Sequence, residues 1–175
     1  MQSVKVVVTG PFNAGKTTFI KAVSEITVLS TERQVSDFSG ETGGETTVAM
    51  DFGRITVSDD VVLYLFGTPG QARFSFMWET LSEGMLGFVL LVDTTEPSTY
   101  EDAKEMIRFF TEMSDVPFVV AANKVDADDT ETIRSLRGEL GLADKVPLLP
   151  VDARNKDSVK AVLLGLLYEI LESMG

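Results

Sequence analysis

Apolar residues follow two kinds of pattern along the chain, and together they predict an α/β fold. Short apolar runs with few polar interruptions are typical of parallel strands that are buried on both faces. Stretches with apolar residues three and four positions apart lie between these runs and predict helices. The predicted strands are Val4–Thr9, 47–57, Val61–Phe66, Leu86–Asp93, Val116–Ala122 and Val146–Val151. The predicted helices before the C-terminal one are Lys16–Glu25, Ser98–Met113 and Thr130–Leu140.

The order of these elements predicts a six-stranded, mostly parallel sheet with about five helices on its two faces. Ser58-Asp59-Asp60 separates two strand-like runs as a hairpin turn would, so we expect one antiparallel edge strand. Residues 26–46 have no clear period and contain Gly40, Gly43 and Gly44, which is typical of a long functional connection.

The clearest helical period lies at the end of the chain. Its apolar residues are Val159, Val162, Leu163, Leu166, Leu167, Ile170 and Leu171. Such a stripe predicts packing against the core of the domain rather than a surface for a partner.

The composition is that of one globular domain covering residues 1–175. The chain has no cysteine, which excludes disulfides, zinc–thiolate sites, prenylation and palmitoylation, and Gln2 excludes N-myristoylation. A formal net charge of −12 argues against nucleic acid and anionic membranes as partners. No apolar run approaches the roughly 20 residues of a membrane span, and no signal peptide precedes the first strand. We therefore expect a cytoplasmic protein without a lipid anchor or a nucleic acid partner.

Residues 10–17, Gly-Pro-Phe-Asn-Ala-Gly-Lys-Thr, fit the phosphate-binding P-loop pattern G-x-x-x-x-G-K-[ST] between a predicted strand and a predicted helix. Its glycines let successive backbone N–H groups point at one anion, and the N-terminus of the helix adds partial positive charge. Lys16 can reach the β- and γ-phosphates, and the Thr17 hydroxyl can ligate Mg²⁺. The predicted phosphate-binding residues are Gly10, Asn13, Ala14, Gly15, Lys16, Thr17 and Thr18.

Asn123-Lys124-Val125-Asp126 indicates which base accompanies the phosphates. The motif lies at the end of a predicted strand, where ligands bind in open α/β sheets. The Asp126 carboxylate can accept two hydrogen bonds from the N1–H and the exocyclic amine of guanine, and adenine has no such pair of donors on that edge. With adenine the carboxylate would be desolvated and unpaired, so the motif predicts a guanine nucleotide as the ligand.

Together these motifs resemble a Ras-like small GTPase of the P-loop GTPase superfamily, with its segments in order across nearly the whole chain. The run from Thr47 to Phe52 is similar to the switch I threonine and the following strand of Rab-type proteins. Phe66–Phe74 resembles switch II, Ala14–Thr17 resembles the Arf-type loop, and Pro150–Arg154 resembles the last guanine-contacting loop. The mixture is similar to prokaryotic Ras-like GTPases, and among them to the gliding-motility type.

The resemblance implies a molecular switch in prokaryotic signalling that hydrolyses GTP slowly, with Mg²⁺ as its cofactor. It makes Lys16 and Gln71 catalytic, Gln71 by orienting the attacking water. It makes Thr17 and Thr47 the metal ligands, with Thr46 as the alternative to Thr47. It also implies a protein partner that binds the GTP state, with a roadblock-type activator as the hypothesis.

The same resemblance assigns the remaining contacts with the nucleotide. The N–H of Gly70 would contact the γ-phosphate, and the N–H of Ala153 would meet the oxygen of the base. The residues implied around the base are Asn123, Lys124, Asp126, Asp152, Ala153 and Arg154.

Two positions depart from the pattern of these GTPases. Gly67 stands where switch II normally has an aspartate that holds magnesium through water, and Phe12 stands where many relatives have a small residue. Asp51 and Asp93 are candidate replacements for the aspartate, although a surface or packing role is the favoured interpretation of each. The departures keep open a second function, a nucleotide-binding scaffold or pseudo-GTPase with little hydrolysis. A P-loop kinase is disfavoured by the guanine motif and by the lack of a lid for a second substrate.

Overall fold

The computed structural model describes residues 2–36, 45–70 and 75–175, and within these ranges the strands form one seven-stranded sheet. The strands are β1 (Gln2–Thr9), β2 (Leu29–Ser36), β3 (Glu45–Ser58), β4 (Val61–Gly67), β5 (Gly87–Asp93), β6 (Phe118–Asn123) and β7 (Leu148–Val151). Their order in the sheet is β2-β3-β4-β1-β5-β6-β7. The pairs β2–β3 and β3–β4 are antiparallel, and the other neighbours are parallel.

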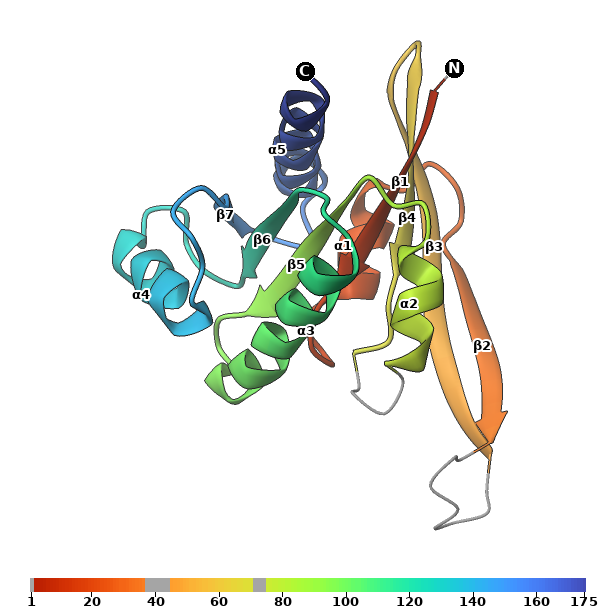
Figure 1. Ribbon diagram of the computed structural model, residues 1–175, viewed down its shortest axis with the longest axis horizontal. Coiled ribbons are helices and arrows are strands. Elements are labelled where there is room, and N and C mark those ends of the chain that lie inside the picture. Colours follow the sequence, from red (N-terminus) through yellow and green to blue (C-terminus); the bar gives the residue numbers. More distant parts are fainter. Residues whose placement is uncertain (1, 37–44, 71–74) are drawn as a thin grey trace.

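Helices cover both faces of this sheet (Figure 1). They are α1 (Lys16–Val23), α2 (Phe76–Ser82), α3 (Tyr100–Met113), α4 (Thr130–Leu140) and α5 (Lys156–Met174), with a short 3₁₀ turn at Pro97–Thr99. One buried apolar cluster joins α1 and α5 to one face, and a second joins α2, α3 and α4 to the other. None of the helices in the described part of the chain is long and apolar enough to cross a bilayer.

The α/β fold with a mostly parallel sheet, an antiparallel edge and five α-helices confirms the prediction from the sequence. Every predicted strand and helix is present among the described residues, and the ends differ by a few residues. The C-terminal helix also packs as expected, with Val159 and Leu166 almost fully buried. Leu171 is an exception, because its side chain is 61% exposed.

The sheet has seven strands rather than six because Leu29–Ser36 adds a strand at the edge, in the region predicted to be an irregular connection. The sequence of β2, Leu-Ser-Thr-Glu-Arg-Gln-Val-Ser, is polar and lacks an apolar run. It forms a strand by antiparallel pairing with β3, from Leu29 opposite Phe52 to Ser36 opposite Glu45. An edge strand that pairs on one side has little apolar surface to bury, so hydropathy alone does not reveal it.

The buried face of α5 gives a test of the core. Replacing Leu166 with alanine removes a side chain that is 1% exposed, so we expect the free energy of unfolding to fall by about 2–5 kcal/mol. The matched control is Leu164→Ala on the same helix. The Leu164 side chain is 53% exposed, and its loss should change stability by no more than about 0.5 kcal/mol. Urea denaturation followed by circular dichroism measures both, and equal effects would contradict this packing.

Candidate functional site

A cavity of about 1160 Å³ lies among the loops that follow β1, β4, β5, β6 and β7, together with the start of α1. Ligands bind at this edge in open α/β sheets. Most of the residues predicted to contact a nucleotide line it: Asn13, Gly15, Lys16, Thr17, Thr18, Gly70, Asn123, Lys124, Asp126, Asp152, Ala153 and Arg154. The structure therefore brings the P-loop, the start of switch II and both predicted base loops into one site.

Backbone conformation explains the glycines of the P-loop. Gly10 and Gly15 have φ angles of 151° and 108°, which L side chains rarely adopt, and Asn13 is left-handed at 66°. A Cβ at Gly10 would lie 2.2 Å from the carbonyl oxygen of Leu91. The loop therefore turns sharply against β5 and delivers its chain into the N-terminus of α1, where Gly15 is the N-cap.

Lys16 is the cation at the centre of the loop. Its Nζ donates to the carbonyl oxygens of Gly10, at 2.5 Å, and Pro11, at 2.9 Å. Burial lowers the pKa of Lys16 to about 8, and the negative charge of Asp51 acts in the opposite direction. The ammonium is thus held over the loop at a cost in hydration, which an anion in the cavity would offset.

Gly70 lies directly against this lysine. A Cβ on Gly70 would be 2.7 Å from Lys16 Nζ and 2.4 Å from the backbone nitrogen of Phe12. The preceding residue is fixed by Trp78, whose Nε1 donates to the carbonyl oxygen of Pro69 at 2.9 Å. The start of switch II therefore packs so closely on the P-loop that only a residue without a side chain fits at position 70.

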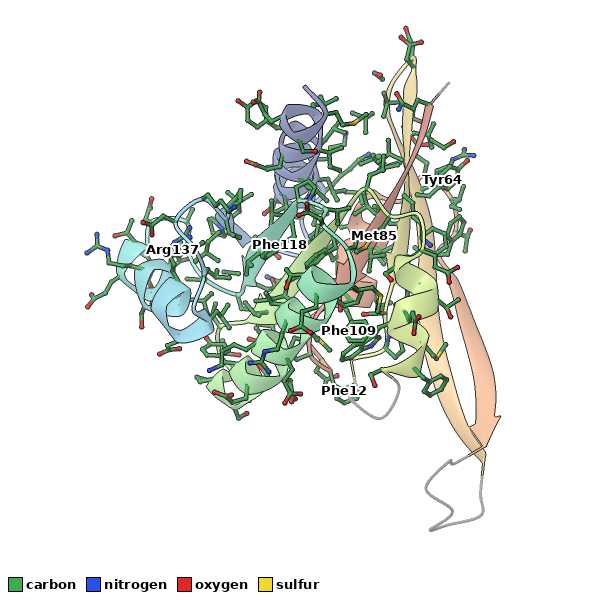
Figure 2. All side chains as sticks on the ribbon, in the orientation of Figure 1. Phe12, Tyr64, Met85, Phe109, Phe118 and Arg137 are labelled. Carbon is green, nitrogen blue, oxygen red and sulfur yellow. The ribbon has the colours of Figure 1, made fainter. Side chains whose placement is uncertain are left out.

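The Phe12 side chain lines the cavity, yet it is 58% exposed and lies at the periphery of the molecule (Figure 2). The backbone nitrogen of Phe12 lies close to Gly70, 2.4 Å from where a Cβ at that position would be.

Thr17 and Asp51 face each other in the cavity. The Thr17 hydroxyl donates a hydrogen bond to Asp51 Oδ2, and both residues line the site. Asp51 is in β3, directly opposite Gly67 in the antiparallel ladder with β4. Asp51 therefore has a place in the site, contrary to the surface or packing role that the sequence favoured.

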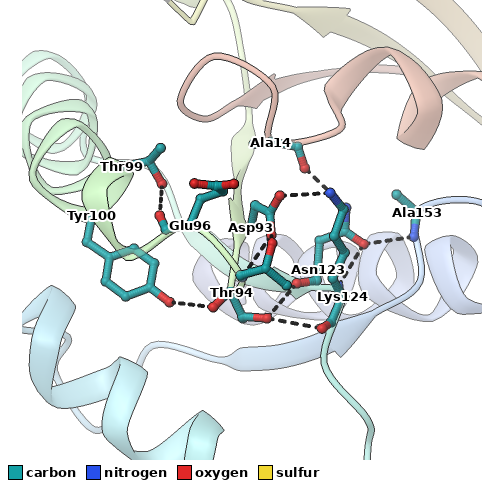
Figure 3. A network of polar contacts seen from close by, with 10 residues as sticks. Ala14, Asp93, Thr94, Glu96, Thr99, Tyr100, Asn123, Lys124 and Ala153 are labelled. Carbon is teal, nitrogen blue, oxygen red and sulfur yellow. Dashed lines mark hydrogen bonds and ion pairs between the residues drawn. The ribbon is translucent and has the colours of Figure 1, made fainter.

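Asn123 joins three loops at the other end of the cavity (Figure 3). Its Nδ2 donates to the carbonyl oxygen of Ala14 in the P-loop at 3.1 Å. Its Oδ1 accepts from the N–H groups of Lys124, at 3.0 Å, and Ala153, at 3.2 Å. The Ala153 N–H predicted to meet the base thus donates to Asn123, and its contact with a base oxygen stays a prediction.

Lys124 follows with a left-handed backbone, φ 66°, and its Nζ forms a 2.8 Å ion pair with Asp93 Oδ2. Burial acts to raise the pKa of Asp93, but hydrogen bonds from Lys124 and Thr95 outweigh it and hold the pKa below its usual value. The Asp93 side chain is only 6% exposed and is paired with Lys124 (Figure 3). It also accepts two hydrogen bonds from Thr95. Asp93 therefore has the packing role that the sequence favoured, and it is not placed to support a metal.

Two exposed carboxylates complete the base end. Asp152 accepts from the backbone N–H and the Nε of Arg154, at 3.0 and 3.2 Å, which lowers its pKa. Asp126 lies on the exposed rim of the same cavity. Thr94, which the sequence analysis missed, lines the cavity and donates to the carbonyl oxygens of Asn123 and Lys124. Its position directly after a predicted central strand was the available signal.

Several predicted residues are not tested by this geometry. Gln71 lies outside the described residues. Thr46 and Thr47 lie in β3, where their backbones pair with Val35 and Gln34. Gly10 and Ala14 belong to the P-loop without being among the residues that line the cavity. The roles of these five residues stay predictions, as do the contacts with a nucleotide predicted for the residues that line the cavity.

Comparison with known proteins identifies a family. Residues 31–173 match the model of the family described as "Conserved hypothetical ATP binding protein". This match includes Asn123–Asp126 and begins after the P-loop. An uncharacterized protein of Methanocaldococcus jannaschii is 33% identical over 130 residues, which make up 74% of this chain and 75% of that protein.

Eukaryotic Ras-related proteins are similar at lower identity. Human Rab-8B is 27% identical over 134 residues, covering 73% of this chain and 65% of that protein. RABD1 of Arabidopsis thaliana is 28% identical over 141 residues, covering 74% of this chain and 66% of that protein. The chain thus spans just under two thirds of the length of these relatives. The matches support a nucleotide-binding, small-GTPase-like protein, and the resemblance to the gliding-motility type stays a prediction.

The pKa of Lys16 predicts how phosphate binding depends on pH. A phosphate binds the protonated form of Lys16. Well below pH 8 the Lys16 side chain of the free protein is already protonated, so binding requires no proton uptake. As the pH rises above about 8, the free protein loses this proton, and affinity for GDP should fall by up to about tenfold per pH unit.

Calorimetric titration with GDP from about pH 7 to about pH 9 measures this dependence. The control is Lys16→Arg, because arginine stays protonated throughout that range. Whatever affinity for GDP remains in that variant should not change with pH. An equal slope in both proteins would show that another group is responsible for the pH dependence.

Proposed function

We propose that this chain, which belongs to the family of conserved hypothetical ATP-binding proteins, is a slow GTPase that acts as a molecular switch. The observation that carries the proposal is the Asn123 side chain, which bonds the P-loop at Ala14 and the last loop at Ala153. The loop proposed to bind phosphates and the loop proposed to contact the base are thereby parts of one cavity.

Guanine is proposed over adenine because of Asp126. The name of the family refers to ATP, but the residues at the rim of the cavity would determine which base binds. Asp126 lies there on the loop after β6, as the guanine motif requires. Its carboxylate would pair with two donors of guanine and with none on the corresponding edge of adenine.

Magnesium is proposed as the cofactor, and the residues present fit it. Thr17 offers a hydroxyl oxygen inside the cavity. Thr47 is proposed to add a second ligand in the GTP state. The described residues contain no cluster of three or more acidic, histidine or cysteine side chains that could hold a metal alone. This suits Mg²⁺, which is commonly bound through one or two protein oxygens with phosphates and water. When bound, it neutralises charge on the phosphates.

The proposed reaction is in-line attack of water on the γ-phosphate. Lys16 and the N–H groups of the P-loop stabilise the charge, and Gln71 positions the water. The N–H of Gly70 and the hydroxyl of Thr47 would contact the γ-phosphate, so its loss releases two loops at once. The contact of Gly70 with Lys16 supports this coupling.

A switch that turns over slowly needs a partner that reads or accelerates it. We propose a cytoplasmic, prokaryotic signalling role with a protein partner that binds the GTP state, a roadblock-type activator being the specific hypothesis. A scaffold that binds GTP with little hydrolysis is the alternative, because Gly67 lacks the usual carboxylate.

Base selection gives the first test. Wild-type protein should bind GDP more tightly than ADP by at least about a hundredfold, as a site with a polar group matched to its ligand does. Asp126→Asn should shift the preference from guanine toward xanthine nucleotides, since an amide replaces the acceptor pair. Asp128→Asn, an exposed carboxylate two residues away that does not line the cavity, is the matched control. Equal affinity for GDP and ADP in the wild type would refute the guanine assignment.

Hydrolysis gives the second test. Single-turnover assays should give an intrinsic rate on the order of 10⁻⁴ to 10⁻³ s⁻¹, as for an unassisted small GTPase. Gln71→Leu should lower this rate and leave the affinity for GTP unchanged, because the residue is proposed to act on water. Tight binding with no measurable turnover in the wild type would favour the scaffold.

A further inference from the structure

We infer that Asp51 provides the carboxylate that orients Thr17 as a magnesium ligand, in place of a side chain at position 67. The inference rests on the proposed function, because it concerns the metal that accompanies the nucleotide. It is carried by the position of Asp51 in the sheet and by its hydrogen bond with Thr17.

The ladder between β3 and β4 places the carboxylate. Asp51 and Gly67 are direct partners in this antiparallel pair, so their side-chain positions share one face of the sheet. A Cβ built at Gly67 would lie 3.3 Å from Asp51 Cβ and 3.5 Å from Asp51 Oδ2. The carboxylate of Asp51 therefore already lies in contact with the space that a side chain at position 67 would enter.

The hydrogen bond determines what the carboxylate can do there. The Thr17 hydroxyl has one proton and two lone pairs, and it donates that proton to Asp51 Oδ2. The lone pairs are then left for a cation, and the negative acceptor raises the basicity of the hydroxyl oxygen. Carboxylates that bond to a metal ligand in this way fix its orientation and tune its affinity for the metal.

The carboxylates of Asp93, Asp126 and Asp152 do not offer this arrangement. Asp93 is paired with Lys124 and Thr95, and Asp152 accepts two hydrogen bonds from Arg154. Asp126 lies on the loop after β6, with the base motif. Among the acidic residues that line the described cavity, Asp51 is the one bonded to the P-loop threonine.

One consequence concerns Gly67 itself. Adding an aspartate there would put a second carboxylate beside Asp51, and its Cβ would also meet Ile20 Cδ1 at 3.0 Å. Like charges this close oppose each other. Gly67→Asp alone is therefore not expected to strengthen metal binding. Gly67→Asp combined with Asp51→Ala keeps a single carboxylate and transfers it from β3 to the paired position in β4.

The experiment follows the release of a fluorescent GDP analogue at increasing Mg²⁺ concentration, and in EDTA. Asp51→Asn keeps an oxygen that can accept from Thr17 and removes the charge. It should raise the Mg²⁺ concentration needed to slow release by about 10–100-fold, with the release rate of each protein in EDTA as its own reference. Asp59→Asn, an exposed carboxylate at the far end of the same hairpin, should behave as the wild type. The double variant Asp51→Ala, Gly67→Asp should recover much of the Mg²⁺ response.

Each result decides the question. An unchanged Mg²⁺ requirement in Asp51→Asn would overturn the inference, and so would an equal acceleration of release in Mg²⁺ and in EDTA, which indicates a purely structural role. Recovery in the double variant supports it even if a single variant is destabilised. A wild type that retains a fluorescent ADP analogue instead would refute guanine selection, and the same Mg²⁺ test would be run with that nucleotide. A wild type that retains neither would overturn both proposals.

Discussion

One buried amide group determines how the loops of this site are arranged. Asn123 is 5% exposed, and its side chain bonds backbone groups that follow β1, β6 and β7. A buried donor or acceptor that loses its partner costs about 1–3 kcal/mol, so a shift of any one loop is penalised. The parallel order of the strands brings the loops near each other, and the amide fixes their separation.

The second constraint is electrostatic. A protein with a net charge of −12 repels anions at long range, so an anion site must depend on local groups. Lys16 provides a full positive charge, and its pKa near 8 reflects burial that Asp51 only partly offsets. Asp51 thus acts on two residues of the proposed phosphate site, on the Lys16 ammonium through its charge and on Thr17 through a hydrogen bond.

Much of this could be predicted from the sequence, because local patterns determine it. Residues 10–17 and 123–126 are contiguous motifs beside apolar strands, and the structure places both at one cavity. The placement of Asp51 could not be predicted, since it depends on the register of β3 against β4, which spans a turn and a bulge. For the same reason β2 was missed, because its pairing partner rather than its own composition makes it a strand. Helix α2 was not located either, since it is only seven residues long.

The packing of Gly70 connects the two constraints. A group that binds Lys16 must compete with the carbonyl oxygens of Gly10 and Pro11, and it must share space with the Gly70 backbone. That backbone is tethered through Pro69 to the buried Trp78 on α2. A displacement of Lys16 would therefore strain the hydrogen bond between Trp78 and Pro69. Helix α2, which carries Trp78, packs in the apolar cluster that also contains α3 and α4. The end of the cavity that contains Lys16 is in this way linked through Pro69 and Trp78 to the face of the sheet that α2, α3 and α4 cover.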